Sequence, residues 1–387
     1  MTFRHIIMVV ADSLRWDYWV KHFPLPIGEE YRSVTNGLWT PTSMASILTG
    51  NLPIRTGVHC FEDIMRGKNM ISMLSDMGYK CRFNELTIYE DIHDGRHTEG
   101  LSFPYFFKIS GLKLEKKKPL YEIIAEDLPS FTWIHCMHTH VPYNKGADML
   151  PEKMEKKIKS GELSRAELAG YYDVSVGIWY EKWHAFMDYI DGLGRDDILV
   201  IMLSDHGEML LENYGQIDRY WHNYDFYPEM IYVPVVWYYR GCEKVRRTEY
   251  RVRHVDILPE MMKRLGGEVP KDINGLPYTN KMIFSGIWAA FNYGCAVEFN
   301  NIIYSPSDAR QMFNKIPLPR FREDPNMIEN MILDGMGTEI FIHADGRGVQ
   351  AHDVMRNIFR RALLKFKAVP EWNGIPKNAP IVDESDV

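Results

Sequence analysis

Short apolar runs rich in branched side chains recur along the first two thirds of the chain, and each ends at polar residues. These runs are residues 6–10, 131–137, 198–203 and 233–239. An apolar run of this length, without polar alternation, is typical of a strand that is buried on both faces of a sheet. We therefore predict four buried strands that belong to one sheet.

Helical patterns occupy the stretches between these runs. Residues 41–49, 70–77 and 165–193 carry apolar side chains at helical spacing. Strands that alternate with helices indicate a parallel sheet covered on both sides. The sequence thus predicts an α/β protein, a three-layer α/β/α sandwich with a mostly parallel central sheet.

The regular alternation stops near residue 275. We predict a catalytic domain over residues 1–275 and a smaller C-terminal α+β subdomain over residues 276–368. Within the subdomain we expect strands at 297–303 and 339–343 and a helix at 354–366. Residues 369–387, which contain prolines and an acidic run, are expected to form a flexible tail.

Polar side chains that could perform chemistry follow three of the predicted strands. Asp12 follows the first run, His138 and His140 follow the second, and Asp205 and His206 follow the third. Ligands of parallel α/β sheets bind beyond the carboxyl ends of the strands. Carboxylates that approach one another repel unless a cation lies between them, and this set suits zinc, manganese or calcium. The alternative for each aspartate is the cap of a following helix.

Thr40 is the candidate nucleophile. It precedes Pro41 at the start of a predicted helix, where we expect it to be the N-cap residue. A hydroxyl in this position faces free backbone N–H groups and the positive end of the helix dipole, which together favour phosphate or sulfate. A threonine hydroxyl is a weak nucleophile, and coordination to a metal is one way to activate it.

The composition narrows the class of partner. Hydrophobic residues make up 45% and charged residues 25% of the chain, as in ordinary folded soluble proteins. A net charge of -7 without a long basic run argues against a nucleic-acid partner. Five scattered cysteines show no zinc spacing or disulfide framework, and the first apolar run is too short to span a membrane. We expect a cytoplasmic protein that acts on a small molecule without a membrane partner; the oligomeric state stays open, a homo-oligomer included.

Six segments resemble motifs of the sulfatase family, a branch of the alkaline phosphatase superfamily, and they occur in family order. Residues 40–50 resemble the signature in which Cys or Ser, then x-Pro-Ser-Arg, leads into Leu-Thr-Gly, and this spacing places Thr40 at the nucleophile position. The other segments match metal, substrate and helix motifs of the family: residues 12–17, 138–143, 204–208, 227–236 and 252–259.

The resemblance implies an alkaline phosphatase-like fold and a set of site residues. It implies one divalent metal ion held by Asp12, Thr40, Asp205 and His206. It also implies contacts to the substrate anion from histidines of two segments, namely His140, His222 and His138. A second metal would need further ligands, for which His222 and His254 are the candidates, and we expect one ion.

The sequence departs from the family pattern at the nucleophile position, whose residue determines whether sulfate or phosphate esters can be hydrolysed. Position 40 is threonine rather than the oxidisable cysteine, and Met44 replaces the signature arginine, so formylglycine cannot form. A sulfated alcohol has no easy exit, whereas a phosphothreonine can be hydrolysed by metal-assisted attack of water. We expect a hydrolase of phosphodiesters, phosphomonoesters or phosphonate monoesters. The alternatives are a sulfatase that acts without formylglycine and a non-catalytic protein that binds a metal or an anion.

Overall fold

The computed structural model describes residues 3–56, 58, 65, 68–84, 120–126, 128–143, 151–212, 219–222 and 227–278, and five short strands between 285 and 350. The chain divides into two units, each made of separated segments. The first unit holds residues 1–32, 70–222 and 232–248, and the second holds residues 33–69, 223–231 and 249–387.

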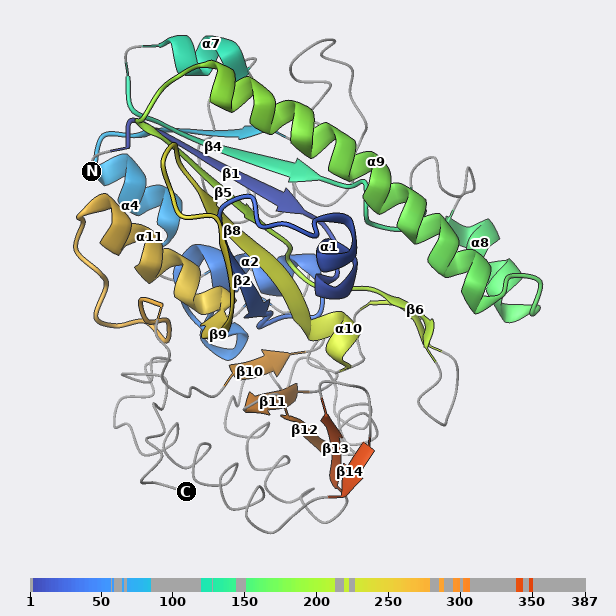
Figure 1. The fold of residues 1–387 in the computed structure, drawn as a ribbon. Coiled ribbons are helices and arrows are strands. Elements are labelled where there is room, and N and C mark those ends of the chain that lie inside the picture. Colours follow the sequence, from blue (N-terminus) through green and yellow to red (C-terminus); the bar gives the residue numbers. More distant parts are fainter. Residues whose placement is uncertain are drawn as a thin grey trace. The chain divides into compact units, whose positions relative to one another are not determined.

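A mostly parallel sheet dominates the first unit (Figure 1), as the hydrophobic pattern predicts. The strand order is β3-β4-β1-β5-β8-β2-β9. β3, β4, β1 and β5 are parallel, and β8 runs antiparallel to β5. The strand bounds are β1 His5–Ala11, β2 Glu29–Val34, β3 Lys80–Asn84, β4 Ser130–Cys136, β5 Ile198–Leu203, β8 Tyr232–Tyr238 and β9 Val245–Arg253. β2 and β9 each begin in the first unit and end in the second.

The register of the three central strands brings their carboxyl ends to one edge. Ala11 of β1 pairs with Cys136 of β4, and Val10 pairs with Leu203 of β5. All residues of these three strands are buried. The segments that follow these strands therefore leave the sheet side by side, which is the arrangement that a shared site requires.

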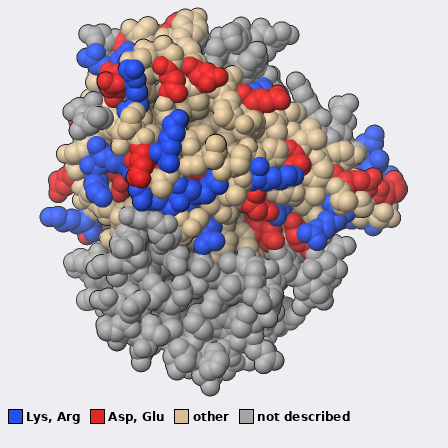
Figure 2. Space-filling view, in the orientation of Figure 1, with Lys and Arg blue, Asp and Glu red and all other residues tan. Residues whose placement is uncertain are grey.

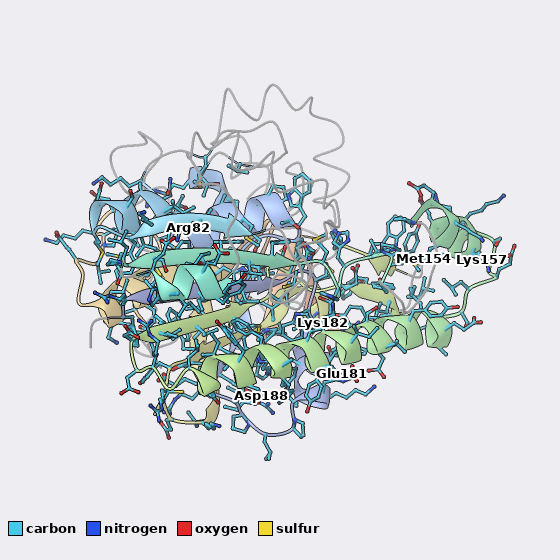
Figure 3. All side chains as sticks on the ribbon, turned by 90° about the horizontal axis from the view of Figure 1, so that it is seen from above. Arg82, Met154, Lys157, Glu181, Lys182 and Asp188 are labelled. Atoms are coloured by element: carbon cyan, nitrogen blue, oxygen red, sulfur yellow. The ribbon has the colours of Figure 1, made fainter. Side chains whose placement is uncertain are left out.

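The first unit contains a long helix that covers the sheet and several shorter ones. α9 (Arg165–Gly192) crosses one face of the sheet in Figure 1, and it begins at a capping box in which Ser164 and Glu167 satisfy each other's backbone N–H groups. In Figure 3, Glu181, Lys182 and Asp188 mark the course of α9. The other helices are α1 (Trp16–His22), α4 (Met70–Asp76), α7 (Leu120–Ala125) and α8 (Pro151–Lys159). β6 (Met209–Glu212) and β7 (Arg219–Trp221) form a separate antiparallel pair.

Aromatic side chains form much of the core under α9. Trp179 and Trp183 of α9 stack with their ring centroids 5.6 Å apart. Trp19 of α1 stacks on Phe23, with a centroid separation of 3.8 Å. All four side chains are at most 1% exposed. Many of the tryptophans thus stabilise the fold by packing rather than by binding a ligand.

The second unit contains short helices and a separate antiparallel sheet. Its helices are α2 (Thr40–Thr49), α3 (Pro53–Thr56), α10 (Pro228–Ile231), the 3₁₀ turn η1 (His254–Asp256) and α11 (Ile257–Leu265). The sheet has the order β10-β11-β12-β13-β14. Its strands are β10 (Ser285–Trp288), β11 (Cys295–Phe299), β12 (Ile302–Pro306), β13 (Glu339–His343) and β14 (Gly348–Gln350).

Two details of the predicted elements are corrected. The single strand predicted at 297–303 is a pair of strands, β11 and β12, which pair in the antiparallel direction. Helix α2 begins at Thr40 itself, and Trp39 is its N-cap, since Trp39 has extended dihedral angles and its carbonyl accepts from the N–H of Ser43.

Other predictions for the C-terminal part have different outcomes. The strand predicted at 339–343 is β13. The helix predicted at 354–366 and the tail from 369 lie outside the described residues. The boundary near 275 stays a prediction.

Charged side chains of both signs occur on the face of the described part that Figure 2 shows. None of the helices in the described part of the chain is long and apolar enough to cross a bilayer.

Candidate metal centre and catalytic site

Three of the four predicted metal ligands converge in the first unit. Asp12 follows β1, and Asp205 and His206 follow β5, the parallel neighbour of β1. One ligand atom from each residue lies within 4.8 Å of the others, and all three residues are 0% exposed. His206 Nε2 lies 3.4 Å from Asp205 Oδ2 and 3.9 Å from Asp12 Oδ1.

Neither aspartate caps a helix. The N-cap residue of α1 is Arg15, three residues after Asp12, and the element that follows Asp205 is the strand β6. Asp205 Oδ1 instead accepts hydrogen bonds from the backbone N–H groups of Ser13 and His206, at 3.0 and 2.9 Å. Helix capping therefore does not account for either buried carboxylate.

The orientation of His206 fits metal coordination. Its Nδ1 lies 2.9 Å from the carbonyl oxygen of Gly207, which can only accept, so Nδ1 carries the proton. Nε2, the ring nitrogen that faces both carboxylates, then has the lone pair. Two carboxylates and one imidazole form a donor set that suits zinc or manganese, and two buried negative charges require such a counter-charge.

Asp12 is held in its ionised form by its neighbours. Burial by itself raises the pKa of this carboxyl, but His140 and His135 act in the opposite direction, and the pKa lies well below the usual range. Asp12 Oδ1 accepts from Ser13 Oγ and Oδ2 accepts from His135 Nε2, both at 2.9 Å. An ionised carboxylate is the form that binds a cation.

Arg15 connects the two segments that carry the ligands. Its Nη1 donates to the carbonyl oxygen of Glu208 at 3.1 Å and to Glu212 Oε1 at 2.6 Å. Its backbone N–H donates to the hydroxyl of Tyr172, which in turn donates to the carbonyl oxygen of Ser13. The guanidinium is nearly fully buried, so these contacts anchor the loop after Asp12 to α9 and β6.

The histidines predicted to contact the substrate lie beside this cluster. The ring centroid of His222 is 4.4 Å from that of His206 and 5.0 Å from that of His140. His140 Nδ1 donates to the carbonyl oxygen of Val141 at 2.6 Å, so Nε2 is the ring nitrogen left for a ligand. His138 is buried in the same segment, and its contact with the substrate stays a prediction.

Glu208 was missed as a site residue by reasoning from the sequence. The two oxygens of its buried carboxyl lie 3.3 and 3.4 Å from His222 Nδ1. Burial raises the pKa of Glu208 to about 8. Burial, together with the nearby His140, lowers the pKa of His222 to about 4. The position of Glu208 directly after the Asp-His-Gly motif could have indicated a site residue. Its contact with His222, however, joins residues 14 positions apart, and no local pattern predicts it.

Thr40 lies in the second unit, as the first residue of α2, and is 8% exposed. Its roles as nucleophile and fourth ligand stay predictions. His254, a candidate ligand for a second metal, is also in the second unit. Its Nδ1 lies 2.8 Å from Oγ of Ser43, a residue of α2. Within the described residues, Asp12, Asp205 and His206 are the one group of three or more acidic, histidine or cysteine side chains that converges in this way.

Comparison with known proteins identifies relatives of the chain. The family model described as Sulfatase matches residues 4–267. A low-salt glycan biosynthesis sulfotransferase of Haloferax volcanii is 24% identical over 313 residues, which is 75% of this chain and 69% of that protein.

Solved structures with low sequence identity share the fold. The phosphonate monoester hydrolase of Silicibacter pomeroyi has a TM-score of 0.62 at 13% identity, with 93% of this chain and 94% of that chain covered. The lipoteichoic acid synthase LtaP of Listeria monocytogenes has a TM-score of 0.57 at 15% identity, with 94% and 90% covered. At these identities the likeness concerns the fold, which confirms the predicted alkaline phosphatase-like α/β architecture.

Proposed function

This chain belongs to the sulfatase family, and on that premise we propose that it hydrolyses phosphate esters through a covalent phosphothreonine on Thr40. Membership of the family makes it a hydrolase of ester bonds. The observation that carries the proposal is the buried convergence of Asp12, Asp205 and His206. Three ligand atoms of mixed oxygen and nitrogen type in a solvent-free position have little structural purpose without a cation.

The protein groups have separate roles in the proposed reaction. Asp12, Asp205 and His206 would hold the divalent ion, and the resemblance to the family implies that Thr40 would be the fourth ligand. When bound, such an ion neutralises charge on a phosphoryl oxygen and lowers the pKa of a coordinated hydroxyl. The rings of His140 and His222 contact the remaining phosphoryl oxygens. Nδ1 of His140 already donates to the carbonyl oxygen of Val141, so its Nε2 donates to a phosphoryl oxygen only when the ring is doubly protonated. Positioning and electrostatic stabilisation supply most of the acceleration in phosphoryl transfer.

The covalent step transfers the phosphoryl group to the protein and then to water. Thr40 Oγ1 forms a bond to phosphorus as the bond between phosphorus and the leaving oxygen breaks, and the leaving oxygen departs as the alcohol after it takes up a proton. Water then attacks the phosphothreonine, releases the phosphate product and restores the threonine hydroxyl. The protons balance over the two steps: the proton that the Thr40 hydroxyl loses matches the one that the leaving alcohol takes up, and the attacking water supplies the oxygen on phosphorus and the proton that restores the hydroxyl. No oxidation state changes, so no oxidant is needed.

The choice of phosphorus over sulfur follows from the residue at position 40. A threonine cannot become formylglycine, so a sulfated intermediate would lack the route by which an aldehyde hydrate expels sulfate. A phosphothreonine is open to attack by water at phosphorus. The Thr40 side chain therefore supports phosphate, phosphodiester or phosphonate esters as the substrate class.

A second candidate is sulfuryl chemistry without formylglycine. The family name and the named activity of the Haloferax relative, a sulfotransferase, both favour sulfate as the transferred group. In this case Thr40 would bind and polarise the group, and the acceptor would be water or an alcohol. The two candidates predict different products from the same assay.

The first prediction concerns turnover by Thr40 variants. We would assay an aryl phosphate monoester, a phosphodiester, a phosphonate monoester and an aryl sulfate, with Mn²⁺ or Zn²⁺ added singly. Thr40→Ala should lower kcat/KM for phosphorus esters by roughly three orders of magnitude, because the nucleophile is removed. Thr40→Ser should retain a measurable part of the rate, and acid quenching of the wild type should trap phosphate on peptide 40–55 for detection by mass spectrometry.

The same assay separates the alternatives. Full activity of Thr40→Ala together with loss of activity in Asp205→Asn would contradict the phosphothreonine and favour direct attack by water. Turnover of aryl sulfate alone, with or without an alcohol acceptor, would favour the sulfuryl candidate. Metal binding without turnover of any ester would identify a non-catalytic binding protein.

A further inference from the structure

His135 is a buried histidine in contact with the metal centre that has no role in the proposed reaction. It lies on β4, one residue before the end of the strand, and is 3% exposed. Its Nε2 lies 2.9 Å from Asp12 Oδ2, across 123 residues of sequence. A carboxylate oxygen can only accept, so Nε2 carries the proton of this hydrogen bond.

The strand register explains why this contact forms. Val10 of β1 pairs with His135 of β4 in a parallel arrangement, so the two side chains lie on one face of the sheet. Asp12 is two residues after Val10 and therefore points to the same side. The ladder extends as far as Asp12, whose N–H donates to the carbonyl oxygen of Cys136 at 2.9 Å. The imidazole thus reaches the carboxylate diagonally between neighbouring strands.

The two oxygens of Asp12 are held by different partners. Oδ2 accepts from His135, whereas Oδ1 accepts from Ser13 Oγ and is the oxygen that lies 3.9 Å from His206 Nε2. Rotation of the carboxylate about its Cβ–Cγ bond would break both hydrogen bonds. The contact with His135 therefore leaves Oδ1 as the oxygen that faces His206 Nε2.

We propose that His135 is a positioning residue of the metal centre, which fixes the Asp12 carboxylate in the orientation that a divalent cation requires. The inference rests on the proposed function, since it assumes that Asp12 is a ligand. Groups that hydrogen-bond to metal ligands typically change affinity by roughly 10–100-fold when they are removed. Loss of His135 should therefore weaken metal binding, and this effect can be measured without any chemical step.

The second prediction is measured as metal affinity of the whole chain, without reference to turnover. The dissociation constants of Mn²⁺ and of Zn²⁺ are determined separately by calorimetric titration of chelator-treated protein, with bound metal counted after dialysis. His135→Leu should weaken binding by roughly 10–100-fold. His135→Gln, whose amide N–H can take the place of Nε2, should bind close to the wild-type value.

His5→Leu is the matched control. His5 is a buried histidine on the same pair of strands, where its Nδ1 lies 2.8 Å from Oγ of its register partner Ser130 at the opposite end of β1 and β4. The His5→Leu variant loses a buried hydrogen bond comparable to that of His135, but His5 does not contact Asp12. The metal affinity of this variant should therefore equal that of the wild type. An equal loss in His5→Leu would mean that the effect is general destabilisation, which overturns the inference.

Further variants keep the inference testable if His135→Leu does not fold. His135→Asn keeps a polar side chain that is too short to reach Asp12 Oδ2, and it should lose affinity where His135→Gln does not. In an Asp12→Asn background, replacement of His135 should cause little further loss. Wild-type affinity in folded His135→Asn and His135→Leu overturns the positioning role and leaves the proposed function intact. A wild type that binds neither ion overturns both.

Discussion

Among the buried histidines, the partner of each ring determines what it contributes. His206 donates its Nδ1 proton to a carbonyl and turns Nε2 toward two carboxylates, so it is arranged as a ligand. His135 instead donates a hydrogen bond from Nε2 to the Asp12 carboxylate. His5 lies at the other end of the sheet beside Ser130. Burial is the same for all three side chains, and it does not by itself distinguish a ligand from a structural residue.

The third prediction uses His5, whose contribution is to stability. Burial, assisted by Arg195, lowers the pKa of His5 from 6.5 to about 4. Between these values the unfolded chain binds a proton that the folded chain does not, so this contribution is present above pH 6.5 and is lost as the pH falls toward 4. The shift corresponds to at most roughly 3 kcal/mol. The free energy of unfolding of His5→Asn should therefore depend less steeply on pH than that of the wild type in this window.

Denaturant unfolding at half-unit pH steps between 4.5 and 7.5 measures this difference. A chelator is present throughout, so that metal binding, which is itself pH-dependent, does not contribute. Titrating groups common to both proteins cancel in the comparison. Parallel curves for wild type and His5→Asn would show that His5 does not titrate with a lowered pKa.

At the scale of elements, helix α2 shows how a fully buried helix is held at its C-terminal end. All ten residues of α2 are buried, and the helix ends at Gly50, which has a left-handed φ of 65°. The carbonyl oxygen of Gly50 accepts from the backbone N–H groups of Asn274 and Gly275, and Asn274 Oδ1 accepts from the N–H of Leu52. Residues more than 220 positions away thus complete the hydrogen bonds that the helix end leaves open.

The fourth prediction compares two glycines that end helices in the second unit. Gly50 and Gly266 have φ values of 65° and 70°, but an added Cβ would lie 2.8 Å from Ile273 Cδ1 at Gly50 and would meet nothing within 4 Å at Gly266. Gly266→Ala should lower the free energy of unfolding by about 1–2 kcal/mol, through backbone strain alone. Gly50→Ala should lower the free energy of unfolding by roughly 1–3 kcal/mol more than Gly266→Ala, because Ile273 and its neighbours must also shift to make room for the Cβ.

Chemical denaturation of the two alanine variants provides the test. Equal losses of stability would mean that Ile273 moves aside without cost. The comparison is informative because both positions are left-handed helix ends, and they differ in what surrounds them.

At the scale of the whole molecule, the metal centre couples binding to stability. Asp12 and Asp205 bring two buried carboxylates together at the ends of β1 and β5, in the centre of the main sheet. Their mutual repulsion opposes folding when no cation is present, and a cation that binds only the folded chain stabilises it. Without a cation, the centre therefore lowers the free energy of unfolding that the apolar strands and the aromatic core provide.

The fifth prediction is that metal removal lowers the unfolding temperature of the intact chain. At a free metal concentration of 100 times the dissociation constant, a single site adds about 2.7 kcal/mol to the free energy of unfolding. The doubly substituted chain Asp12→Asn, Asp205→Asn should show no such response, and without metal it should unfold at or above the temperature of the wild type. A temperature rise on metal addition that persists in this variant would place the ion elsewhere.

The strands of the main sheet differ in how readily the sequence reveals them. β1, β4, β5 and β8 are mostly apolar, although β4 also contains Thr132 and His135, and all four were predicted within a residue or so. β2 and β9 carry several charged side chains, so their patterns do not indicate buried strands. Arg246 of β9 pairs with Glu30 of β2, a contact that compensates buried charge but exists only once the strands are adjacent. Local hydrophobicity therefore predicts a strand whose side chains are apolar and buried. It does not predict a strand whose charged side chains form ion pairs with a neighbouring strand.

The amino-acid sequence alone determined the α/β class, the buried central strands and the presence of Asp12, Asp205 and His206 at strand ends, because burial and chain direction leave local patterns. The tertiary structure decided which oxygen of Asp12 faces His206, and it revealed His135 and Glu208 as neighbours of the site. These contacts depend on strand register and side-chain rotation between residues far apart in the chain. A hydrogen bond needs both partners at defined positions, and no periodicity within a single segment contains that information.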